Sequence, residues 1–198
     1  MEQFQNYIKE KRGINIGRMQ IFSLIISLVF IVLYGVAFAN YGDNTLSFLN
    51  LFAGKSVISI ILLFTKFFLM IAIGICLHEL VHGIFFALYA KGGFKSIRFG
   101  ILTNPVFAFY CHCKEPIKVH QYMVVAIMPL FLTGILPSAI AIVLGDVVLL
   151  LTGFILTVGA VGDIMMIQML WKEDRNSYLL DHPSEIGFYI LKEKNIEV

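Results

Sequence analysis

Residues 67 to 90 read FFLMIAIGICLHELVHGIFFALYA, an apolar run that also contains two histidines and one glutamate. A helix that crosses a bilayer needs about 20 predominantly apolar residues, and this run is long enough. Ionisable side chains inside such a helix are costly to desolvate and usually mark a functional site. The stretch therefore predicts a membrane helix that carries chemistry.

The polar residues of this run form the pattern HExxH, with His78, Glu79 and His82. Residues four apart on a helix project to the same side, so both imidazoles can bind one metal ion. Glu79 projects beside them and is predicted to act as the catalytic base that takes a proton from the attacking water. The motif predicts Zn²⁺ as the cofactor, and a polar contact between helices without metal is the alternative.

A third zinc ligand can be sought by elimination, because a catalytic zinc usually has three protein ligands. Apart from Glu79, the carboxylates in the apolar stretches are Asp146, which falls in a turn, and Asp163. Asp163 and His82 are predicted at nearly the same depth, at about 1.5 Å of helix per residue from the polar end of each stretch. Asp163 is therefore the predicted third ligand, and a polar contact between helices is again the alternative.

The composition predicts that lipid is the solvent for much of the surface. The chain has 198 residues, of which 59% are hydrophobic and 14% charged, and its net charge of +2 gives no indication of a nucleic-acid partner. We therefore expect an all-α polytopic membrane protein with the lipid bilayer as a partner, and leave its oligomeric state open. Its four predicted transmembrane helices are residues 19–39, 57–90, 122–144 and 147–170.

Two features of these stretches leave alternatives open. The basic head and Ala37-Phe38-Ala39 resemble a signal peptide with its cleavage site, but the length of the run favours a retained helix. The second stretch is longer than a bilayer requires, so it is either one long helix or a span of residues 67–90 with Lys66 at the outer interface. In the third stretch, Pro129 and Pro137 predict a kink or a break.

Basic residues concentrate on one predicted side of the membrane. By the positive-inside rule, both termini and the loop between the second and third helices face the cytoplasm. The basic residues that decide this are Lys9, Lys11, Arg12, Arg18, Lys91, Lys95, Arg98, Lys114, Lys118, Lys172 and Arg175. We expect an integral protein with one domain over residues 1–198: a head (1–18), a membrane core (19–171) and a cytoplasmic tail (172–198).

The cytoplasmic loop at residues 94–118 predicts a small β-hairpin, because apolar and polar residues alternate on both sides of an Asn104-Pro105 turn signal. An irregular apolar loop is the alternative. Cys111, His112 and Cys113 suggest a second metal site, but two thiolates on one face fall short of a closed site, so reduced cysteines are preferred. His112, His120 and His182 are interpreted as surface or packing residues, and a short helix is expected after His182-Pro183.

The motif HELVHG at residues 78–83, within a membrane helix, resembles a bacterial membrane family of putative zincin peptidases. Other similar pieces are residues 113–116, 162–164 and 181–183. More distantly, the chain resembles the site-2 intramembrane metalloproteases. That resemblance implies an aspartate ligand on a later membrane helix, which maps to Asp163, and a hairpin that pairs with extended substrate. The bacterial cytoplasmic membrane as location is likewise implied by resemblance.

Together these observations predict a zinc metalloprotease of the intramembrane type. It would hydrolyse peptide bonds near the cytoplasmic side of the membrane, including bonds within transmembrane substrates, so a peptide or membrane protein is the expected substrate partner. Two alternatives stay open. One is a peptidase of soluble or membrane-surface peptides, and the other is a membrane protein that binds metal without catalysis.

Overall fold

The computed structural model describes residues 7–41, 51–103, 108–182 and 186–193. It contains four helical segments that are long and apolar enough to cross a membrane, as the sequence predicted. The first is α1 (Ile16–Tyr41) and the second is α2 (Val57–Tyr89), which is one continuous helix and not two pieces. The third and fourth are Val119–Leu144 and Val147–Leu170.

The third segment is continuous but irregular. It consists of α3 (Val119–Pro129), a π-helical turn η4 (Leu130–Ile135) and α4 (Leu136–Leu144). The predicted disturbance by proline thus takes the form of a π-helical turn that begins directly after Pro129. Such turns often occur at functional sites. The fourth segment consists of α5 (Val147–Gly159) and α6 (Val161–Leu170).

The predicted tight turn between the third and fourth segments is confirmed. Gly145 ends α4 in the left-handed conformation, at φ 67°. Asp146 then caps α5, because its carboxylate accepts hydrogen bonds from the backbone N–H groups of Val148 and Leu149. Lys66 Nζ, on α2, lies 3.7 Å from the Asp146 carboxylate, so Lys66 has a partner in this turn.

The chain forms two compact units, and their boundaries fall inside all four helical segments, α1 and α2 included. The first, here called the sheet unit, comprises Met1–Arg18, Glu79–Met128 and Gly162–Val198. The second, the span unit, comprises Met19–His78 and Pro129–Val161.

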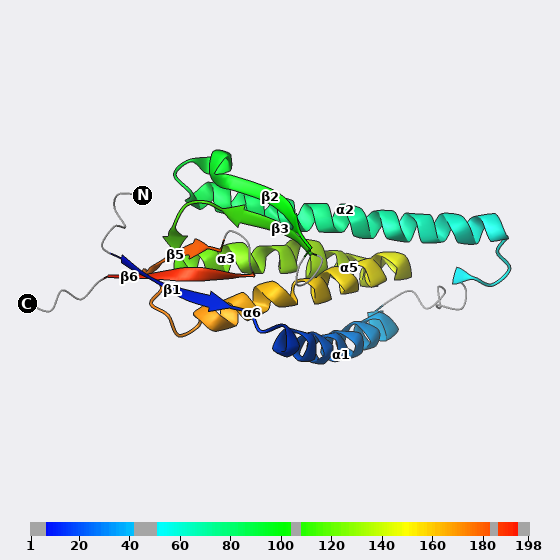
Figure 1. Ribbon diagram of the computed structural model, residues 1–198. Helices are drawn as coiled ribbons and strands as arrows, with labels where there is room; N and C mark the ends of the chain where they lie inside the picture. Colours follow the sequence, from blue (N-terminus) through cyan, green and yellow to red (C-terminus); the bar gives the residue numbers. More distant parts are fainter. Residues whose placement is uncertain (1–6, 42–50, 104–107, 183–185, 194–198) are drawn as a thin grey trace, which may run out of the picture. The chain divides into compact units, whose positions relative to one another are not determined.

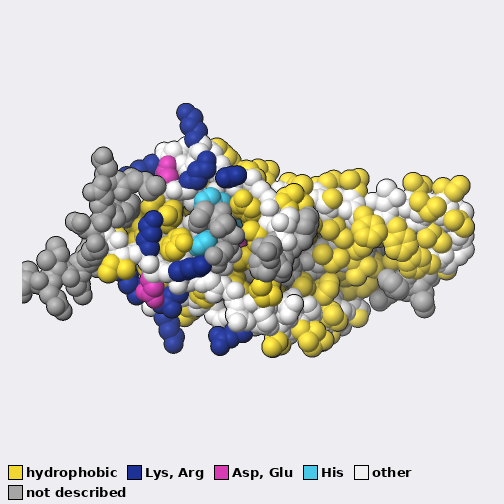
Figure 2. All heavy atoms as spheres, in the orientation of Figure 1, with side chains coloured by type: hydrophobic (Ala, Val, Ile, Leu, Met, Phe, Trp, Pro, Cys, Tyr) yellow, Lys and Arg dark blue, Asp and Glu magenta, His cyan; other side chains and the backbone are white. Residues whose placement is uncertain are grey.

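In the span unit, helices are packed closely through small residues. A methyl group added at Gly153 would lie 3.0 Å from the Ser138 backbone nitrogen, so α4 and α5 approach each other to backbone contact there. None of the residues of α1, all of which are described, is buried. Tyr34 of α1 forms a hydrogen bond of 3.2 Å with Thr157. Hydrophobic side chains cover much of the helix surface in Figure 2, as expected for segments in contact with lipid.

The sheet unit contains a four-stranded antiparallel sheet that the sequence did not predict (Figure 1). Its order is β1 (Tyr7–Gly13), β6 (Gly187–Glu193), β5 (Tyr178–Asp181) and β4 (Ile117–Lys118). The all-α expectation is therefore incomplete, and the short helix expected after His182-Pro183 is wrong. A strand forms instead because Phe188 and Ile190 bury their side chains while the backbone pairs with β1 and β5.

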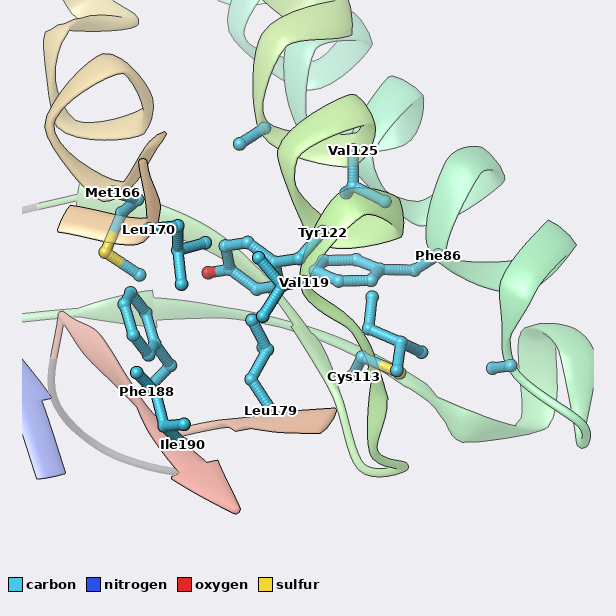
Figure 3. Close-up of a cluster of buried hydrophobic side chains, with 13 residues drawn as sticks. Phe86, Cys113, Val119, Tyr122, Val125, Met166, Leu170, Leu179, Phe188 and Ile190 are labelled. Atoms are coloured by element: carbon cyan, nitrogen blue, oxygen red, sulfur yellow. The ribbon is translucent and has the colours of Figure 1, made fainter. Parts of the chain in front are cut away.

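The core of the sheet unit joins this sheet to the ends of three helices. Figure 3 shows the ring of Tyr122 beside that of Phe86, with a centroid distance of 5.7 Å. The Tyr122 ring also lies 5.8 Å from the ring of Phe188 on β6. Val119, Leu170 and Leu179 complete the same buried cluster. Because α2, α3, α6 and the sheet share this core, side chains on those helices are held at fixed positions.

The predicted hairpin between the second and third segments is confirmed. It consists of β2 (Ile97–Leu102) and β3 (Ala108–Cys113), in antiparallel register with Phe99 opposite Cys111. Its predicted turn at Asn104-Pro105 lies outside the described residues. The hairpin lies against α2 at Gly83. A methyl group added there would be 2.5 Å from Phe99 Cζ and 3.6 Å from Cys111 Sγ. Only a glycine leaves this approach open without displacement of the ring.

Candidate metal centre

Two of the predicted ligands face each other inside the sheet unit. His82 Nε2, on α2, lies 3.4 Å from Asp163 Oδ1, in the first turn of α6. That distance is longer than a charge-assisted hydrogen bond of about 2.7–2.9 Å. It matches the separation of about 3.3–3.4 Å between two ligand atoms that are each about 2.0–2.1 Å from a tetrahedral zinc. The pair therefore has the spacing of two ligands of one ion.

The other ring nitrogen of His82 is held by the backbone of α3. His82 Nδ1 lies 3.1 Å from the carbonyl oxygen of Val125. A carbonyl only accepts hydrogen bonds, so Nδ1 carries the proton and donates it. The lone pair is then on Nε2, which faces Asp163. Metal-binding histidines typically have this arrangement, with the non-ligating nitrogen donating to a carbonyl or carboxylate.

His78 lies on α2 one helical turn before His82, and it is buried within the span unit. Its Nδ1 lies 3.4 Å from Thr133 Oγ1, a long hydrogen bond. The Thr133 hydroxyl donates its own proton to the carbonyl of Pro129 at 2.8 Å. Thr133 therefore accepts from His78 Nδ1, so the lone pair of His78 is on Nε2, the atom that would act as a ligand.

The ligand atoms of His78, His82 and Asp163 all lie within 4.8 Å of one another. These are the three ligands that the sequence predicted. Two neutral imidazoles and one carboxylate are a donor set of the kind found at catalytic zinc sites, which leave a fourth position for water or substrate. The residues present therefore fit a zinc ion.

Glu79, the predicted catalytic base, lies between the two histidines in the sequence, and its side chain is half-buried. It acts electrostatically on the hairpin: burial raises the pKa of the Cys111 thiol, and the negative charges of Glu79 and Asp181 raise it further. Strand β3 is therefore close to Glu79.

The sequence reasoning missed a largely buried carboxylate at Asp181, whose side chain is 12% exposed. The Asp181 carboxylate accepts hydrogen bonds from the Tyr122 hydroxyl at 3.2 Å and from the backbone N–H of Cys113 at 3.3 Å. His112 Nδ1 lies 3.3 Å from the same carboxylate. Asp181 thus connects β5, α3 and the hairpin. The available signal was that Asp181 directly follows three apolar residues, Tyr178, Leu179 and Leu180, because a charge next to buried apolar residues needs a partner.

The remaining cysteines and histidines have local roles. Cys111 and Cys113 are free thiols on one face of β3, and strand alternation directs His112 to the other face. Burial raises the pKa of Cys113 to about 11, so at neutral pH it is a protonated packing residue. His120 Nδ1 is bonded to the Arg175 carbonyl at 2.8 Å, and His182 stacks on Tyr189.

The fold and the site together define a helical protein with four segments able to cross a membrane and a His-His-Asp set suited to zinc. The chain belongs to the putative zincin peptidase family, whose profile matches residues 71–178. That range includes the part of α2 that carries HExxH, the hairpin and both later helical segments. No curated protein and no solved structure matches the chain. The family supports assignment as a zinc metalloprotease.

Proposed function

We propose that this chain is a zinc-dependent membrane-embedded endopeptidase that cleaves peptide bonds near the cytoplasmic side of the membrane, including bonds within transmembrane segments. The observation that carries the proposal is the pair His82 Nε2 and Asp163 Oδ1, 3.4 Å apart on two apolar helices. A partly buried carboxylate beside a buried imidazole whose other nitrogen is already bonded is well explained by a shared metal ion.

The chain's own residues have separate roles in this proposal. His78, His82 and Asp163 hold the ion, and Glu79 takes a proton from the attacking water and passes it to the leaving amine. When bound, zinc polarises the scissile carbonyl and lowers the pKa of water. The Val125 carbonyl keeps His82 in the tautomer that binds metal.

The hairpin is the proposed substrate platform. Among the described strands, β2 is paired on one side only, with β3, so its other edge has backbone groups that can pair with an extended peptide. The contact of Phe99 with Gly83 places this strand beside the metal motif. A transmembrane substrate would have to unwind locally, and addition to β2 supplies the hydrogen bonds that unwinding breaks.

Metal content tests the ligand set. We expect about one zinc per chain in the detergent-purified wild type, by the coordination chemistry of one such site. Zinc should be lost in His78→Ala and Asp163→Asn and retained in Asp174→Asn, a matched change at an exposed turn. Zinc retained in Asp163→Asn would remove that ligand, and an unmetallated wild type after zinc supply would refute the proposal.

Cleavage assays test the catalytic role and the substrate class. Glu79→Gln should bind zinc but cleave nothing, whereas Glu10→Gln, on exposed strand β1, should retain activity. Equal activity of Glu79→Gln and wild type would favour a protein that binds metal without catalysis. Comparison of a transmembrane substrate with a soluble peptide separates the proposed activity from a peptidase of soluble or surface peptides.

The orientation is also a proposal. Strands β1 and β6 bring the residues next to both termini into one sheet, so both ends of the described chain lie in the same unit. Lys and Arg side chains are conspicuous over this unit in Figure 2, which favours the cytoplasm by the positive-inside rule. A C-terminal green fluorescent protein fusion should fluoresce, and an alkaline phosphatase fusion at that end should be inactive.

A further inference from the structure

The carbonyl that holds His82 lacks its regular helical partner. In an α-helix, the carbonyl of each residue accepts from the N–H four residues later. For Val125 that residue is Pro129, which has no N–H. The Val125 oxygen is therefore available to a side chain, and His82 Nδ1 donates to it at 3.1 Å.

The turn after Pro129 serves the other histidine. Thr133 lies four residues later, in the π-helical turn η4, and it is buried. Its hydroxyl donates to the Pro129 carbonyl at 2.8 Å, which fixes the direction of the hydroxyl proton. An oxygen lone pair of Thr133 is then available to His78 Nδ1 at 3.4 Å.

We infer that Pro129 and Thr133 are positioning residues of the metal centre. The proline frees an acceptor for His82, and the threonine supplies one for His78. Each contact keeps a proton on Nδ1 and leaves Nε2 as the ligand atom. The inference rests on the proposed role of both histidines as zinc ligands. It assigns to one irregular turn the task of setting the tautomers of both.

Two replacements at position 129 separate the missing N–H from the shape of the proline ring. Pro129→Ala supplies an N–H that competes with His82 for the Val125 carbonyl. The α-hydroxy acid analogue of alanine, introduced by nonsense suppression, has neither the ring nor the N–H. We expect Pro129→Ala to weaken zinc binding by about 10- to 100-fold, the usual effect of losing such a partner. The ester variant should bind zinc as the wild type does.

Thr133 has a matched control in the same unit. Thr152 is also buried and donates to a carbonyl four residues earlier, that of Val148 at 2.9 Å. Thr133→Val should weaken zinc binding, whereas Thr133→Ser and Thr152→Val should not. Zinc affinity is measured by competition with a chelator. The side-chain ¹⁵N shifts of labelled histidine report which ring nitrogen carries the proton, with and without zinc.

The outcomes distinguish this inference from the proposed function. Equal loss of affinity in Pro129→Ala and the ester would show that the ring itself matters and would overturn the role of the missing N–H. Wild-type affinity in Thr133→Val would overturn the role of Thr133. If the wild type binds no zinc, the proposed function fails, but the ¹⁵N shifts still decide. The inference is supported if the Nδ1 proton of His82 loses its hydrogen bond in Pro129→Ala but keeps it in the wild type and the ester variant. Unchanged ¹⁵N shifts in Pro129→Ala overturn the inference.

Discussion

Replacing Gly83 by alanine should push the hairpin away from the HExxH helix. The added methyl would lie 2.5 Å from Phe99 Cζ and 3.1 Å from Phe99 Cε1, whereas ordinary contacts are at 3.4 Å or more. The backbone of α2 cannot move without displacing His82, the preceding residue. The Phe99 ring, which is 49% exposed, must therefore move outward. Its contact with α2 is then lost.

The expected magnitude is a balance of two effects. Overpacking of this kind costs about 1–3 kcal/mol. Alanine in place of a helical glycine returns about 0.5–1 kcal/mol. Gly35→Ala in α1 is the matched control, because a methyl there meets nothing within 4 Å and only the favourable term applies. The two variants should therefore differ by about 1–3 kcal/mol in the free energy of unfolding, with Gly83→Ala the less stable.

Thermal unfolding in detergent and peptide cleavage are the two assays for this prediction. Gly83→Ala should bind zinc but cleave extended substrate less well than Gly35→Ala, because displacement of the Phe99 ring disturbs the packing of β2 on α2. Phe99→Leu combined with Gly83→Ala should recover part of the stability, since the shorter side chain relieves the contact. If Gly83→Ala is as stable and active as Gly35→Ala, the hairpin does not depend on this contact and the reasoning is wrong.

Three further predictions concern the sheet unit. Asp181→Asn should lower the free energy of unfolding by about 1.5–3 kcal/mol in chemical denaturation, since hydrogen bonds to a largely buried charged acceptor are lost or weakened. Asp174→Asn, in an exposed turn, should have little effect. In a variant with Cys113 as its single cysteine, alkylation should stay slow at neutral pH and accelerate only near pH 11, because burial raises the pKa of this thiol to about 11; a midpoint near the ordinary thiol value of about 8.5 would contradict this. The Lys192 ammonium lowers the pKa of Glu10, so their ion pair stabilises the fold at neutral pH and is lost as the pH falls through the lowered pKa. The difference in the free energy of unfolding between wild type and Lys192→Gln should therefore vanish in acid. A difference that persists in acid would refute the ion pair.

The helical segments and the candidate ligand set could be predicted because their signals are local or follow from bilayer geometry. Four apolar runs give four helices, and an i, i+4 spacing places His78 and His82 on one face. Asp163 is on another helix, yet equal depth, counted from the polar end of each stretch, was enough to pair it with His82. In a membrane, depth supplies a coordinate that a soluble protein's sequence does not provide.

The sheet could not be predicted, because its strands are defined by partners far away in sequence. Strand β1 reads YIKEKRG and has the composition of a charged head, and it becomes a strand by pairing with β6 near the other terminus. Phe188, Ile190 and Leu191 of β6 are buried apolar residues, but an apolar run this short does not distinguish a strand from a helix.

The structure also changes how the prolines of the third segment are understood. From the sequence, Pro129 predicts only a disturbed helix, because its missing N–H removes one helical hydrogen bond. The sequence does not show which other donor the released carbonyl accepts from. That donor, His82, lies 43 residues from Val125 along the chain. A proline that frees a carbonyl inside a membrane leaves a polar group that cannot turn to water, so some other donor must satisfy it. The same chemical demand explains why a histidine can be fixed there at little cost. In the proposed membrane setting, the irregular turn and the position of the His82 ring therefore support each other.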